Sequence, residues 1–234
     1  MLMMNRLANF AAVAALALSP LALADDDYRT FDQAAQQALT PDQAIDILKA
    51  GNERFVSGES YDRDLIDQQK DTAGGQFPFA VVLSCLDSRS APEVVFDQGV
   101  GDLFVGRVAG NVVDTNLLGS FEFATAAAGS KLIVVMGHTA CGAVKGACDG
   151  VEVGNLTALL DEIEPAIDAV STPAGTDRSS SNTEFVNRVV ETNVRMQVNE
   201  LLRRSDVVRD LVDQGQVKVV GAVHDIATGE VTFL

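Results

Sequence analysis

The chain has few basic residues and, beyond residue 24, no long apolar run. Its 17 Lys and Arg stand against 33 Asp and Glu, which gives a formal net charge of −16 at pH 7. So acidic a surface repels phosphate groups, which argues against nucleic acids and anionic membranes as partners. No segment after residue 24 approaches the roughly 20 consecutive apolar residues that a membrane-spanning helix requires. We therefore expect a mature protein without a membrane segment.

Residues 1–24 have the pattern of a cleaved secretory signal. Arg6 supplies a short basic region, residues 7–18 are apolar and uncharged, and residues 22–24 provide small side chains for cleavage before Asp25. The mature protein is predicted to be exported, to a bacterial periplasm, with an uncleaved membrane anchor as the alternative. About 210 residues then remain, which is the size of one α/β domain.

Cysteine is scarce, and its three copies are an odd number for an exported chain. In an oxidising compartment thiols tend toward disulfides, which leaves one of three unpaired. Metal ligation by Cys85 and Cys141 would explain two of them. Cys148 is then a free thiol, predicted to be buried two helical turns from Cys141 and about 10 Å away. A disulfide from Cys85 to either of the others is the alternative.

Hydrophobic patterns predict strands that alternate with helices. A capping box begins a helix at Thr40, and Ser90 is predicted to begin another in the same way. The alternation predicts an α/β fold, a mostly parallel β-sheet flanked by helices. Residues 25–40 are predicted to form an acidic N-terminal arm with a short helix, and residues 41–234 are predicted to form one α/β domain. Strands are predicted at 79–84, 102–108, 131–137, 216–222 and 231–234; helices at 31–38, 41–57, from 92, 117–128, from 141, 155–170, 184–203 and 206–214; and a polar, flexible loop at 171–182.

Two short segments carry most of the chemistry. Residues 85–89 read Cys-Leu-Asp-Ser-Arg and residues 138–142 read His-Thr-Ala-Cys-Gly. Each follows a run typical of a buried parallel strand, so both should emerge at the same edge of the sheet. Two thiolates, an imidazole and a carboxylate are a ligand set suited to zinc. A Cys₂His centre leaves one position for water, substrate or Asp87, as a catalytic zinc requires.

At these residues the chain resembles the β-class carbonic anhydrases. The first segment matches the family's Cys-x-Asp-Ser-Arg, and the second matches its Gly-His-x-x-Cys-Gly. The likeness runs from about residue 44 to the end of the chain. Further segments that read like family blocks are 101–105, 107–111, 119–124 and 221–229.

The resemblance implies that Cys85, His138 and Cys141 hold Zn²⁺. A zinc-bound hydroxide would then attack CO₂ and give bicarbonate and a proton. Two thiolates cancel the formal charge of the dication, so its water should be less acidic than on a three-histidine zinc. We therefore expect activity that favours alkaline pH.

The resemblance also implies a switch between Asp87 and Arg89. When Asp87 binds Arg89, the fourth zinc position is open to water, and the carboxylate can accept a hydrogen bond there. When Asp87 is itself a zinc ligand, the site is closed. The alternative is an ion pair with a structural role only.

Further expectations follow from the same family. Gln76 would bind substrate across a subunit boundary, and the backbone N–H of Gly142 would contact the same anion. The alternatives are an ordinary polar loop residue for Gln76 and tight packing for Gly142. His224 is expected to be packed rather than catalytic, which leaves proton release to carboxylates, water or buffer. The chain has no Trp, so the bicarbonate-inhibition site of some family members is not visible. The arm before residue 40 resembles helices that wrap a partner subunit, which predicts a homodimer or a dimer of dimers.

Two other functions fit the same motifs. The zinc site could hydrolyse COS or CS₂, because related sequences act on these linear analogues of CO₂. The chain could also be a zinc-binding protein without turnover. Asp87 and Arg89 argue against the second alternative, since a structural zinc needs no such pair and usually has a fourth permanent ligand.

Overall fold

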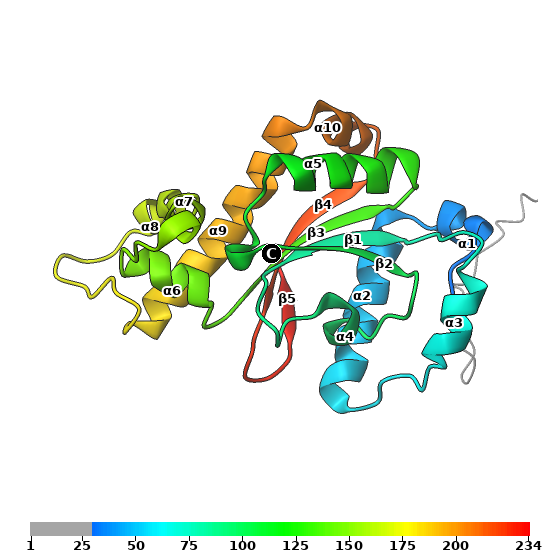
Figure 1. The fold of residues 1–234 in the computed structure, drawn as a ribbon, viewed down its shortest axis with the longest axis horizontal. Helices are drawn as coiled ribbons and strands as arrows, with labels where there is room; N and C mark the ends of the chain where they lie inside the picture. The colour runs from blue at the N-terminus through cyan, green and yellow to red at the C-terminus, as the bar shows by residue number, and fades with distance from the viewer. Residues whose placement is uncertain (1–29) are drawn as a thin grey trace, which may run out of the picture.

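The computed structural model describes residues 30–234, so the predicted signal at 1–24 and part of the acidic arm lie outside the described residues. A five-stranded sheet forms the centre, with strand order β2-β1-β3-β4-β5 (Figure 1). All neighbours are parallel except β5, which pairs antiparallel with β4. The strands are β1 Ala80–Ser84, β2 Leu103–Arg107, β3 Leu132–His138, β4 Lys218–His224 and β5 Val231–Phe233.

Helices cover both faces of the sheet, which confirms the predicted α/β fold (Figure 1). Successive strand side chains point to opposite faces. Val81 and Ile133 therefore pack under α5, α9 and α10, whereas Val82 and Val134 pack on the side of α2. In the part of the chain described, no helix is long and apolar enough to cross a membrane. The helices are α1 Gln33–Ala38, α2 Pro41–Ser57, α3 Leu65–Asp71, α4 Pro92–Val95, α5 Thr115–Glu122, α6 Gly142–Cys148, α7 Gly154–Asp161, α8 Glu164–Ala169, α9 Thr183–Arg204 and α10 Asp206–Asp213.

The N-terminal arm packs against its own chain at the amino ends of the strands. The side-chain amide of Gln36 in α1 is buried and donates to the carbonyls of Pro78 and Ala128 at 2.8 and 2.9 Å. The ring of Phe31 lies 5.0 Å from that of Phe79. The predicted capping box at Thr40 is present and begins α2.

Several predicted boundaries differ from the structure. The predicted helix 155–170 is two helices, because Pro165 in the first turn of α8 cannot continue a helix from α7. In place of the predicted helix 117–128, the structure has α5 followed by a π-helical turn, η2 Phe123–Ala127. Strand β4 begins two residues later than predicted, and α3, capped by Asp64, was not predicted.

Two side chains have roles that the sequence patterns did not indicate. The predicted capping box at Ser90 is wrong: Ala91 precedes α4 without a side-chain cap, and Ser90 binds elsewhere. In the polar 171–182 loop, Arg178 donates to the carbonyls of Ile167 and Val170 at 2.5 and 2.9 Å. These bonds satisfy the end of α8 and tie the loop to it.

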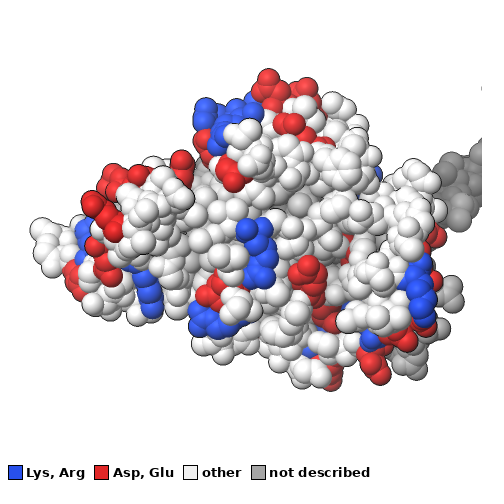
Figure 2. Space-filling model, viewed as in Figure 1, with Lys and Arg blue, Asp and Glu red and all other residues white. Residues whose placement is uncertain are grey.

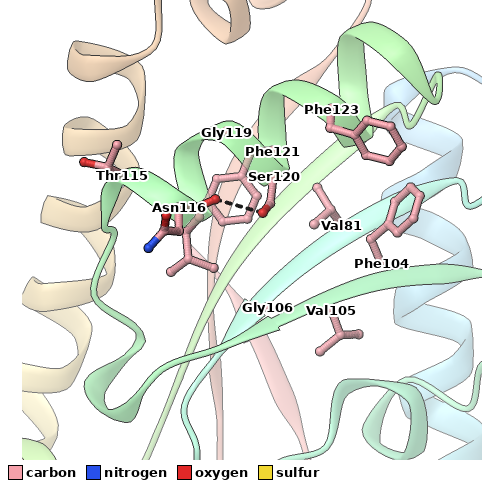
Figure 3. Close-up of a pocket in the computed structure, with 11 residues that line it drawn as sticks. Val81, Phe104, Val105, Gly106, Thr115, Asn116, Gly119, Ser120, Phe121 and Phe123 are labelled. Atoms are coloured by element: carbon pink, nitrogen blue, oxygen red, sulfur yellow. Dashed lines mark hydrogen bonds between the residues drawn. The ribbon is translucent and has the colours of Figure 1, made fainter.

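A groove of about 680 Å³ runs between the edge strand β2 and helix α5 (Figure 3). The rings of Phe104 and Phe123 lie 6.0 Å apart beside it, and Phe123 is 57% exposed. The surface around the groove carries few charged side chains (Figure 2). Within the described residues, no strand pairs with the outer edge of β2.

Candidate metal centre

Strand ends place the predicted zinc ligands together. Cys85 directly follows β1, and His138 is the last residue of β3, the neighbouring parallel strand. Cys141 is the residue before α6, reached through a tight turn in which Ala140 has a φ of 56°. The three ligand atoms lie within 4.8 Å of one another. The prediction that both motifs meet at one sheet edge is therefore confirmed.

The ligands are removed from solvent. Cys85, His138 and Cys141 are 4%, 0% and 1% exposed. All three cysteines are free thiols, and the sulfurs of Cys85 and Cys141 lie 3.8 Å apart. Cys148 is predicted to be buried, but in the structure it is only half-buried. It packs against the apolar cluster beneath the site.

The imidazole of His138 is oriented to bind a cation. Its Nδ1 lies 2.9 Å from the carbonyl of Thr139, so Nδ1 carries the proton. Among the described residues, the buried Nε2 has no hydrogen-bond partner. A buried lone pair without a partner is costly unless a ligand uses it. Two sulfurs and this nitrogen therefore fit zinc, which favours four-coordinate Cys and His sites.

The two thiols are electrostatically coupled. The hydrogen bond from Cys141 lowers the pKa of Cys85 although burial opposes it, and N–H groups of Asp87 and Gly110 add to the effect. The same bond, with burial, raises the pKa of Cys141. A dication that binds both sulfurs would displace any proton that they hold.

Asp87 and Arg89 form a bidentate ion pair beside the ligands. Arg89 donates through Nε and Nη2 to the two carboxylate oxygens at 2.9 and 2.8 Å, and its backbone N–H adds a bond of 3.0 Å. These bonds hold the pKa of Asp87 well below its usual range, so the carboxylate stays ionised. Its Oδ2 lies 3.9 Å from Nε2 of His138. The structure thus has Asp87 bound to Arg89, the open arrangement.

Two strand ends hold the loop that carries this pair. Arg107, at the end of β2, donates to the carbonyls of Cys85 and Asp87. On the other side, the hydroxyl of the buried Ser90 lies 3.0 Å from Nδ1 of His224, at the end of β4. His224 is packed as expected, and burial lowers its pKa. The loop is therefore fixed at both ends.

The remaining predicted site residues differ in their distance from this cluster, since Gly142 directly follows the ligand Cys141 and Gln76 lies far from the ligands. Gln76 is exposed and precedes β1, whereas Cys85 follows it, so the strand separates them by about 17 Å. Within one chain, Gln76 therefore does not reach the ligands. Gly142 is exposed at the first position of α6.

Some contacts of the site were missed from the sequence. The N–H of Gly110 donates to the sulfur of Cys85 at 3.3 Å, and Arg107 binds the carbonyl of the same residue. Asn187 in α9 accepts from the N–H of Ala140 at 3.3 Å. The only sign of Asn187 in the sequence was a polar amide beside the apolar face of the predicted helix 184–203. Such a position does not identify the group that the amide binds.

Comparison with known proteins decides the family. A family model for carbonic anhydrase matches residues 80–231. Carbonic anhydrase 2 of Mycobacterium tuberculosis is 38% identical over 192 residues, which cover 81% of this chain and 90% of the relative. The chain belongs to the carbonic anhydrase family.

Solved β-carbonic anhydrases share the fold of this carbonic anhydrase. A tetrameric enzyme from Sordaria macrospora superposes with a TM-score of 0.61 and 29% identity, covering 70% of this chain and 84% of that one. The Coccomyxa enzyme in complex with acetazolamide gives a TM-score of 0.62 and 26% identity, covering 82% of each chain. This carbonic anhydrase is therefore of the β class, its cofactor is zinc, and its reaction is the reversible hydration of CO₂.

Proposed function

We propose that the centre formed by Cys85, His138 and Cys141 hydrates CO₂ reversibly in the open arrangement, with Asp87 held by Arg89. The observation that carries the proposal is the bidentate Asp87–Arg89 pair at 2.8 and 2.9 Å. It keeps the carboxylate beside the ligand cluster without making it a fourth ligand. A zinc-binding protein without turnover has no use for this arrangement.

The zinc, when bound, acts as a Lewis acid that makes water a nucleophile near neutral pH. Cys85, His138 and Cys141 hold it, and their burial excludes other solvent. Asp87 is ionised and acceptor-only, so it would orient the attacking water by accepting a hydrogen bond from it. Arg89 holds both carboxylate oxygens and so prevents Asp87 from turning toward the cation.

Gln76 and Gly142 are proposed to contact the substrate. Gly142 follows a ligand directly, so its N–H is close enough to bind an oxygen of bicarbonate. Gln76 is too far from its own ligands, and its contact would be with the site of a second subunit. Gln76→Ala should raise KM more than it lowers kcat, and an unchanged KM would rule out this role.

A homodimer or a dimer of dimers is proposed as the working assembly. The unpaired edge of β2 and the uncharged groove beside Phe123 offer a surface for a second copy. The relative from Sordaria macrospora is tetrameric, which supports the proposal. Sedimentation velocity tests it: Phe123→Glu should dissociate the assembly, and a monomeric parent protein would contradict it.

Export to the periplasm is proposed from residues 1–24, whose pattern is that of a cleaved signal. Fractionation of a bacterial host, with N-terminal sequencing of the product, tests this. A mature terminus at Asp25 in the periplasmic fraction is the expected result. Full-length protein that stays in the cytoplasm or membrane would contradict the proposal.

Stopped-flow hydration of CO₂ by metal-analysed protein tests the main proposal. About one zinc per chain and turnover that rises from pH 6.5 to 9 are the expected results, since two thiolates make the zinc a weak Lewis acid. COS and CS₂ are assayed beside CO₂. Turnover of those alone would replace the proposed substrate, and no turnover at full zinc occupancy would contradict catalysis.

A further inference from the structure

Helix α9 presents amide side chains to the metal centre from an otherwise apolar face. Val189, Val190 and Val194 on this face are buried. Asn193 and Gln197, on the same face, are 1% and 7% exposed. Burying an amide costs stability unless its polar atoms find partners. The partners of these amides are therefore informative.

Asn193 and Gln197 hold the segment that follows β2. Nδ2 of Asn193 donates to the carbonyl of Gly110 at 2.9 Å. Its Oδ1 accepts from Nε2 of Gln197 at 3.2 Å, and Oε1 of Gln197 accepts from the N–H of Val113 at 2.8 Å. This chain of bonds fixes both ends of residues 110–113 to the helix.

The segment fixed in this way contacts a zinc thiolate. The N–H of Gly110 donates to the sulfur of Cys85 at 3.3 Å. Gly110 has a φ of 70°, and a Cβ there would lie 2.7 Å from Ile163. Only glycine fits this position, and glycine gives the backbone little rigidity of its own. The bond from Asn193 to the Gly110 carbonyl therefore helps to hold this residue where its N–H reaches the sulfur of Cys85.

Asn187 acts on the other thiolate from the same helix. Its Oδ1 accepts from the N–H of Ala140 at 3.3 Å. Ala140 has a φ of 56°, a strained conformation for alanine, and lies between the ligands His138 and Cys141. The bond stabilises the turn that brings Cys141 to the centre.

We propose that Asn187 and Asn193 are positioning residues for the two zinc thiolates, so that α9 controls zinc retention and the donor strength of Cys85. The inference rests on the proposed function only in taking Cys85, His138 and Cys141 as zinc ligands. An N–H group that donates to a thiolate withdraws electron density from the sulfur, and such partners of a metal ligand tune the metal that it binds. Its loss makes the sulfur a stronger donor to the metal and the metal a weaker Lewis acid.

Zinc release to a chromogenic chelator from the zinc-loaded protein is the first test. Asn193→Leu and Asn187→Leu should release zinc roughly 10–100-fold faster than the parent, because the loss of ligand orientation outweighs the stronger donation from the sulfur of Cys85. Asn187→Asp keeps the acceptor for Ala140 and should restore slow release. Leu201→Val, in the buried part of α9 away from the loops, is the control for general destabilisation.

Absorption of the cobalt-substituted protein is the second test. Asn193→Leu should move the thiolate-to-cobalt charge-transfer band to lower energy, whereas Leu201→Val should leave it in place. Release rates equal to that of Leu201→Val, with an unmoved band, would overturn the proposal. If Asn193→Leu fails to fold, Asn187→Leu against Asn187→Asp still decides, because Asn187 is only half-buried. Neither measurement needs turnover of CO₂. A failure of this proposal can therefore be distinguished from a failure of the proposed function.

Discussion

The zinc ligands and the Asp87–Arg89 pair lie side by side but are built in opposite ways. The ligands are attached to strand ends and to the turn before α6, and all are buried. The pair lies in a loop, and the side chain of Arg89 is 55% exposed. A buried ligand set stays organised, whereas an ion pair near solvent contributes little stability and can exchange partners. The rigid part suits metal retention, and the loop suits control of access.

Removing one of the buried ligands should have the largest effect, with loss of both the metal and the activity. We expect Cys141→Ser to lose zinc and to hydrate CO₂ at the uncatalysed rate, because a hydroxyl is a poor ligand for zinc beside a thiolate. Cys148→Ser is the matched control and should keep zinc and activity. Metal analysis and stopped-flow kinetics measure both. Full zinc content in Cys141→Ser would contradict the assignment.

Removing the carboxylate should affect the loop side without affecting the metal. Asp87→Asn keeps the shape but not the charge, and should lower kcat by roughly 10²-fold, because the attacking water loses the charged acceptor that orients it. Zinc content should stay at that of the parent. Because the pKa of Asp87 lies below its usual range, the carboxylate is ionised throughout pH 6.5–9. A rise of activity with pH in the parent therefore comes from another group, and Asp87→Asn should keep this rise.

A smaller effect is expected from weakening the pair. Arg89→Lys keeps the charge but replaces two parallel bonds with one. Losing a partner of the groups around a metal typically lowers activity by roughly 10–100-fold, and we expect a decrease in kcat/KM of that size. Steady-state kinetics at pH 8 measure it. Unchanged kinetics in Arg89→Lys would mean that the pair does not gate the site.

The smallest effect on activity is expected from Ser90→Ala. It leaves Nδ1 of the buried His224 without a partner and should lower the free energy of unfolding by about 1–3 kcal/mol. Activity should change only a few-fold, since Arg107 still holds the loop. The double variant Ser90→Ala, His224→Phe removes both polar groups and should recover most of the stability. Denaturant titrations compare the three proteins, and equal stability of Ser90→Ala and the parent would contradict this view.

Local patterns in the sequence were sufficient for the ligands and the strands that carry them. The short, β-branched apolar runs before Cys85 and His138 favour buried strands, and parallel strands end at one sheet edge. Boundaries were less certain where long-range contacts compete with local signals. Ser90 has the sequence of a helix cap, but its hydroxyl instead binds His224, 134 residues later.

The sequence by itself determined the family, the metal and the three residues proposed to hold it, because these depend on residue types at short spacings. Only the tertiary structure decided which partner Asp87 takes and how the thiolates are held. Asn187 and Asn193 are separated by many residues from the turns that they bind. Such contacts depend on how α9 packs across the sheet. Local periodicity and spacing in the sequence contain no information about which distant residues this packing brings together.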